Sequence, residues 1–164
     1  MKILLLETFF TGSHKKWAEE LKRFSKHEIE ILSLSGHHWK WRMHGGAISL
    51  AEIKPKAKPD LILATDMIDL NLFLSLTKNW SHNIPTAIYF HENQLNYPWS
   101  PTDADVKLQR DNHYAFINYS SALAADHVFF NSQYHHDAFL NELPKFLKAF
   151  PDNNNLVTVE TIRK

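Results

Sequence analysis

The stretch Pro85-Thr86-Ala87-Ile88-Tyr89-Phe90-His91-Glu92-Asn93-Gln94 decides the fold. It begins as a short apolar run rich in β-branched and aromatic residues, which predicts a buried parallel strand. Four polar side chains, His91 to Gln94, follow directly, without the residues that a solvated loop favours. Donors and acceptors at the carboxyl end of a buried strand suit a binding crevice in an open α/β sheet. The alternative is that His91 and Glu92 only cap the strand and the next helix.

The composition is that of an ordinary globular domain. The 164 residues suffice for one core, with 44% hydrophobic and 22% charged side chains. The formal net charge is zero, which argues against a domain that grips nucleic acid by charge alone but is compatible with a nucleic-acid substrate held mainly by a second domain. The absence of Cys excludes disulfides and thiolate metal sites.

The N-terminal apolar run is too short for a signal peptide and ends at the acidic Glu7. No stretch approaches the roughly 20 apolar residues that cross a membrane. We therefore expect a cytoplasmic protein that does not contact a membrane.

Apolar runs alternate with helical patterns along the chain. Besides the strand at 85–90, strands are expected at 3–6, 28–34, 61–64 and 127–130. Helices are expected from Ser13 to about Phe24, over 47–53, over 70–80, over one long segment that starts at Thr102–Asp105 with a capping-box-like spacing and runs to Ala124, and over 133–150, where Pro144 divides it. This alternation predicts an α/β class, a Rossmann-like parallel sheet with helices on both faces and the strand order 3-2-1-4-5. Residues 1–150 form the expected domain, and 151–164 form a linker with an edge strand at 156–159.

A glycine-bearing loop, residues 7–14, separates the first strand from the first helix. Ser13 is the expected N-cap, and Gly12 lets the backbone approach a ligand closely. In the order 3-2-1-4-5, strands one and four are neighbours, so this loop with His14 would face the segment 91–94 across the crevice. The N-H groups of the following helix would favour a phosphate there. Asn131 and Ser132, which end the fifth strand, would lie beside them.

The segment 37–46, expected as a loop, combines Trp39, Trp41 and Arg42 with three His and a Lys. One interpretation is that the two Trp anchor the loop to the core. The other is an aromatic and basic platform that stacks a base or a sugar and holds a phosphate. The adjacent His37 and His38 have no carboxylate at useful spacing, so no metal site is expected.

Four stretches of the chain, at 7–15, 39–42, 89–98 and 129–132, resemble the tRNA-queuosine α-mannosyltransferase family. The opening resembles the N-terminal half of GT-B glycosyltransferases, which are retaining enzymes that use a nucleotide sugar. The resemblance implies transfer of mannose from GDP-mannose to the cyclopentene-diol of queuosine in tRNA, without another cofactor. It also implies that this domain holds the acceptor and that a C-terminal domain, beginning where this chain stops, binds the donor.

Within this resemblance, His91 is the expected catalytic residue, which positions the sugar and stabilises charge as the phosphate leaves. The expected substrate-binding residues are Gly12, Ser13, His14, Trp39, Trp41, Arg42, Glu92, Asn93, Gln94, Asn131 and Ser132. Two other functions compete with a glycosyltransferase. One is a stand-alone nucleotide- or sugar-binding domain without catalysis. The other is a small hydrolase that uses His91 and Glu92, although the second His of a zincin helix and a Gly-x-Ser-x-Gly elbow are both missing.

Overall fold

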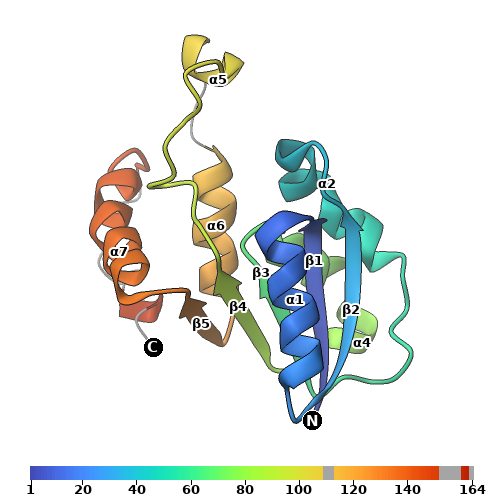
Figure 1. Ribbon diagram of the computed structural model, residues 1–164. Helices are drawn as coiled ribbons and strands as arrows, with labels where there is room; N and C mark the ends of the chain where they lie inside the picture. Colours follow the sequence, from blue (N-terminus) through green and yellow to red (C-terminus); the bar gives the residue numbers. More distant parts are fainter. Residues whose placement is uncertain (109–112, 152–159, 163–164) are drawn as a thin grey trace.

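The computed structural model describes residues 1–108, 113–151 and 160–162, and these residues form a five-stranded parallel sheet with helices on both faces (Figure 1). The strands are β1 (Lys2–Phe10), β2 (Glu28–Ser35), β3 (Leu61–Thr65), β4 (Thr86–Phe90) and β5 (His127–Phe130). The helices are α1 (Gly12–Phe24), α2 (Trp39–Ala51), α3 (Leu70–Leu76), α4 (Lys78–Ser81), α5 (Ala104–Lys107), α6 (His113–Ala124) and α7 (Gln133–Leu147). The predicted Rossmann-like α/β class is confirmed. Among the described residues, no helix is long and apolar enough to cross a bilayer.

Successive residues of β1 supply both faces of the sheet. Leu4 and Leu6 belong to the larger core, which is completed by residues of α2, α3, α6 and α7. Ile3 and Leu5 point the other way and pack with Ala18 of α1. This alternation follows from the period of two residues in a strand. Since β1 is buried from Ile3 to Thr8, both layers are built around it.

The strand order is β2-β1-β3-β4-β5, so the predicted order 3-2-1-4-5 is wrong. The third strand lies beside β1, at the point where the order reverses, and β4 is one place further out. The burial of the strands explains the difference. β3 is apolar from Leu61 to Ala64, as an inner strand of a parallel sheet requires, whereas β2 alternates Glu28 and Glu30 with isoleucines and suits an edge.

Several element boundaries also differ from the prediction. β1 continues to Phe10, and α1 begins at Gly12 with Thr11 as its N-cap, so Ser13 is not the cap. α2 begins at Trp39, so the Trp-rich segment is helical rather than a loop. α5 ends at Lys107, and α6 is a separate helix that begins at His113. The Asp105 side chain pairs with Lys40, so the single long helix with a capping box is not observed. α7 continues through Pro144 without division. The expected edge strand at 156–159 lies outside the described residues.

Two adjacent glycines of α2 allow a test of how closely this helix packs on β1. A Cβ atom at Gly46 would lie 2.5 Å from Thr8 Cγ2, whereas a Cβ at Gly45 would meet nothing within 4 Å. We predict that Gly46→Ala destabilises the protein by about 1–3 kcal/mol because of overpacking. Gly45→Ala is the matched control and should be neutral or stabilising by up to about 1 kcal/mol, since Ala favours the helix. Urea unfolding of both variants measures the difference, and equal effects would contradict the close approach of α2 to β1.

Candidate functional site

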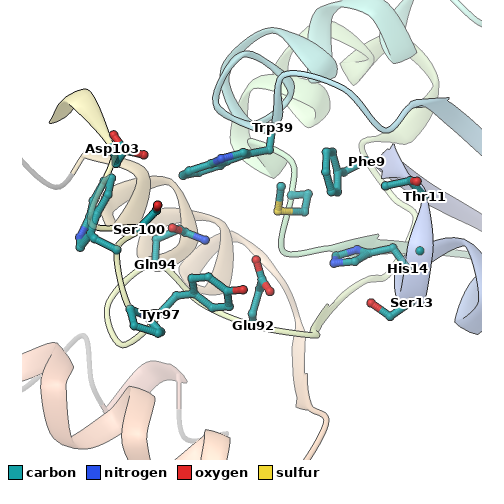
Figure 2. A pocket seen from close by; sticks show the side chains of 14 residues that line it. Phe9, Thr11, Ser13, His14, Trp39, Glu92, Gln94, Tyr97, Ser100 and Asp103 are labelled. Carbon is teal, nitrogen blue, oxygen red and sulfur yellow. The ribbon is translucent and has the colours of Figure 1, made fainter. Parts of the chain in front are cut away.

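A cavity of about 320 Å³ lies at the carboxyl ends of the strands (Figure 2). Aromatic side chains form much of its wall, namely Phe9, Trp39, Tyr97 and Trp99. Polar side chains of the cavity come from α1, the β4 end and the following loop, namely Ser13, His14, Glu92, Gln94, Ser100 and Asp103. The predicted residues Gly12, Ser13, His14, Trp39, Glu92 and Gln94 are therefore brought together. The carboxyl edge of a parallel sheet is where open α/β folds bind ligands.

His14 faces the cavity and is held from behind by a buried acid. Its Nδ1 donates to Glu7 Oε2 at 3.0 Å, and Glu7 Oε1 accepts from the backbone N-H of Phe9 at 2.8 Å. Glu7 is fully buried. Burial alone would lower the pKa of His14, but the hydrogen bond and the charge of Glu7 outweigh it, and the pKa of His14 is raised. The shift favours the charged form of the imidazole that faces the cavity beside Ser13.

His91 contacts the same cluster although β3 separates β1 from β4. Its ring centroid lies 4.2 Å from that of His14 and 4.7 Å from that of Trp17. Trp17 itself stacks on Tyr89 of β4 at 4.5 Å, so α1 reaches across β3 to the β4 end. The predicted meeting of the first loop with the β4 end is confirmed, but α1 produces it rather than adjacency of the strands.

The pKa of His91 is shifted in the direction opposite to that of His14. Burial, together with the charges of His14 and His135, lowers the pKa of His91 to about 3, so its imidazole is neutral at physiological pH. Its Nε2 atom is buried and has no hydrogen-bond partner among the described residues. His91 does not line the main cavity. It lines a second, more open depression, together with Glu92, Asn93, Asn131 and Ser132.

A buried carboxyl, Asp66, fixes the backbone at the β4 end. Asp66 Oδ1 accepts from the His91 N-H at 2.8 Å, and burial raises the pKa of Asp66 to about 8. Asn118 of α6 spans the same gap, because it donates to the Asp66 carbonyl and accepts from the Gln94 N-H, both at 2.8 Å. The path of residues 91–94 is therefore set by side chains of neighbouring elements.

Asn93, Asn131 and Ser132 hold this turn from the other side. The buried Asn93 accepts from the N-H groups of Leu95 and Asn96 and donates from Nδ2 to His135 Nε2 at 2.6 Å. Asn131 donates to the His91 carbonyl at 2.6 Å, and Ser132 accepts from the His135 N-H and so caps α7. Asn93 and Ser132 therefore make the capping contacts here, whereas Glu92, for which capping was the alternative, points its side chain into the cavity.

The residues of α2 divide between the cavity wall and the surface. Trp39 lines the cavity, and its ring centroid lies 5.1 Å from that of Tyr114. Trp41 is 76% exposed, so the core-anchor interpretation is wrong for this residue. Arg42 is half-buried and donates to the Ser35 side chain and carbonyl. Trp41 and Arg42 therefore lie outside the cavity, at the end of α2 that is nearest to it.

One cluster of three side chains, found among the described residues, has the chemistry of a metal site. Glu7, His14 and His91 each offer an atom within 4.8 Å of the others. Glu7 and His14 are already hydrogen-bonded to each other. This cluster is not the His37–His38 pair considered in the sequence, and it lies beside the cavity.

Comparison with known proteins supplies the family. The profile described as tRNA-queuosine alpha-mannosyltransferase N-terminal matches residues 2–164. The chain belongs to this family. A relative named tRNA-queuosine alpha-mannosyltransferase, from Drosophila melanogaster, is 37% identical over 152 residues, which cover 92% of this chain and 39% of that protein. The chain thus spans well under half the length of this relative.

The structure of this member of the tRNA-queuosine alpha-mannosyltransferase N-terminal family adds residues that were not predicted from the sequence. Three side chains hold His14, His91 and Gln94 in place but do not line the cavity themselves, namely Glu7, Asp66 and Asn118. The signal for the two acids was present, because each directly follows an apolar strand run. The signal for Asn118 was absent, since a single Asn in a helical pattern has no distinctive spacing.

Asp66 predicts a pH dependence of stability. Burial holds the folded-state pKa at about 8, so the folded protein keeps a proton that the unfolded chain loses above about pH 4. This group therefore lowers stability as pH rises between these values, by up to about 1.4 kcal/mol for each pH unit. Asp66→Asn removes the effect, and His14 and His91 titrate in both proteins. Denaturant unfolding at several pH values should show the variant gaining on the wild type as pH rises, and a pH-independent difference would rule out a protonated Asp66.

Proposed function

We propose that this chain is the acceptor-side domain of a retaining GT-B mannosyltransferase that transfers mannose from GDP-mannose to queuosine in tRNA. The observation that carries the proposal is the family match over residues 2–164. The cavity at the carboxyl edge of the sheet supports it, because aromatic walls and polar groups of this kind suit a nucleoside with a polar substituent.

The proposal assigns the nucleotide sugar mainly to a second, C-terminal domain. Its support is that the Drosophila relative is much longer than the part aligned here. Residues 1–150 are the acceptor domain and 151–164 the connection, and the protein acts in the cytoplasm without a membrane. A stand-alone binding domain is the alternative, and it would bind acceptor or sugar without transfer.

The two histidines divide the chemical work. His14, whose pKa is raised by Glu7, supplies positive charge where the sugar's phosphate leaves. His91 is neutral and offers a hydrogen-bonding imidazole rather than a charge. Asn93, Asn131 and Ser132 keep the β4 end in place, while Gln94, Gly12 and Ser13 contact the acceptor or the transferred sugar. No covalent step is assigned to these residues.

A glycosyl-transfer assay tests the function. The protein is incubated with queuosine-containing tRNA, tRNA that lacks queuosine, and a panel of nucleotide sugars. We expect transfer from GDP-mannose to the queuosine-containing tRNA when the donor-binding domain is present, and none from this chain alone. Transfer to another acceptor would overturn the assignment, and acceptor binding without transfer by the two-domain protein would favour the stand-alone binding function.

His91→Ala in the two-domain enzyme should lower kcat about 10²-fold or more, in the range seen for removal of one stabilising donor. The ring also packs against Trp17, so its loss changes stability as well as chemistry. Trp17→Leu is the control, because it disturbs the same packing and keeps the imidazole. Steady-state kinetics and melting temperatures should separate the variants, and equal kcat losses would mean that His91 acts only through packing.

Trp41→Ala should raise KM for tRNA roughly tenfold and leave KM for the nucleotide sugar unchanged, because base stacking on an exposed ring is worth about 1–3 kcal/mol. The side chain is 76% exposed, so little stability should be lost. Phe24→Ala is the matched control, since Phe24 is 71% exposed at the far end of α1. If both variants have the wild-type KM for tRNA, Trp41 does not belong to a stacking platform.

A further inference from the structure

The Glu92 carboxylate has an unusual position in the cavity. Figure 2 shows it pointing inward between Tyr97 and His14, with Trp39 on the opposite wall. Glu92 is half-buried, and no hydrogen bond or ion pair reaches its carboxylate from the residues that the structure describes. A partly desolvated carboxylate without a partner costs free energy, which a bound cation would recover.

A second acidic group of the same cavity is already neutralised. Lys40 Nζ lies 2.6 Å from Asp103 Oδ1 and 2.5 Å from Asp105 Oδ2. The same ammonium group lies 5.5 Å from the ring centroid of Trp39 and 5.4 Å from that of Trp99. One side of the aromatic wall therefore holds an ammonium group between rings and carboxylates. The space in front of Glu92 also combines a carboxylate with aromatic rings, and the basic side chain beside it, His14, is hydrogen-bonded to Glu7.

The other charges near Glu92 are balanced among themselves. His14 is hydrogen-bonded to Glu7, so its charge is shared with a closer acid. Asp66 is protonated at neutral pH because burial raises its pKa to about 8. Glu92 has no hydrogen bond or ion pair among the described residues. Burial raises the pKa of its carboxyl, and the nearby charge of His14 offsets that shift only in part. Such a site attracts a cation and repels phosphate, so the backbone of a nucleic acid would not enter it.

We propose that Glu92, with the rings of Trp39 and Tyr97, binds an alkylammonium group of the acceptor, namely the secondary amine of queuosine. The inference rests on the proposed function and adds the contact that selects the acceptor. In queuosine this amine joins the deazapurine to the cyclopentene-diol and is protonated at neutral pH. A carboxylate pairs with it, and aromatic faces stabilise the cation further. Glu92 thereby places the diol next to His14, where transfer takes place.

Binding of three anticodon stem-loop RNAs by the protein tests the inference. The RNAs carry queuosine, queuosine with its amine acetylated and therefore uncharged, or unmodified guanosine at the same position. We expect the wild type to bind the queuosine RNA roughly tenfold tighter than either of the others. Glu92→Gln should bind the queuosine RNA and the acetylated RNA equally, while Glu92→Asp should keep part of the preference. Glu20→Gln, an exposed acid of α1, should behave as the wild type.

The outcomes separate this inference from the proposed function. Equal wild-type binding of queuosine and guanosine RNA would overturn the acceptor assignment itself. A preference for queuosine over guanosine that survives acetylation, or that Glu92→Gln retains, would leave the acceptor in place and overturn the role of Glu92. If Glu92→Gln weakens both queuosine RNAs equally, the carboxylate binds the diol rather than the amine. Circular dichroism and melting temperature identify a variant that has failed to fold, and Glu92→Asp then carries the test.

Discussion

The hydrogen bond from the His91 N-H to the buried carboxyl of Asp66 is the constraint on which the site depends. It joins the buried carboxyl at the end of β3 to the first residue after β4 at 2.8 Å. The bond turns the chain at this point and sends His91 toward α1 and Glu92 into the cavity. An acid in this position costs stability when it ionises, and the raised pKa of Asp66 shows how the protein limits that cost.

Further hydrogen bonds from amide side chains surround this bond. Asn118 ties the β3 end to the segment after β4, and Asn131 ties the same segment to the β5 end. Each of these amides uses both a donor and an acceptor, so the turn is held without glycine or proline. A fully bonded network of this kind is rigid. The side chains of His91 and Glu92 do not take part in this network. His91 Nε2 and the Glu92 carboxylate have no hydrogen-bond partner in the described part of the chain.

The sequence predicted the five strands and six of the fourteen residues that line the cavity, because both follow from local patterns. Apolar runs marked the strands, and the polar residues at strand ends marked the edge that binds ligands. The strand order was wrong because the crossover rule allows the chain to return on either side of β1; the alternating glutamates of β2 indicate its edge position only once the whole sheet is considered. The Trp-rich segment is helical although Gly45 and Gly46 reduce helix propensity. Packing of Gly46 on Thr8 favours the helix here. The ionisation of His91 depends on burial by Trp17 and on neighbouring histidines from other elements, which no local pattern contains.

The arrangement of charge is compatible with the nucleic-acid acceptor that we propose, although the formal net charge of the chain is zero. The formal charges of the chain cancel, and the cavity itself is acidic at Glu92, so attraction to phosphate does not lead the acceptor inside. The exposed Trp41 and the half-buried Arg42, near the start of α2, lie outside the cavity. The interior instead combines aromatic faces with the Glu92 carboxylate, which suits a cationic substituent on a flat base. Under the proposed function, selection of a modified nucleoside by its substituent would need little contact with the rest of the nucleic acid, and a domain without net charge would be compatible with it.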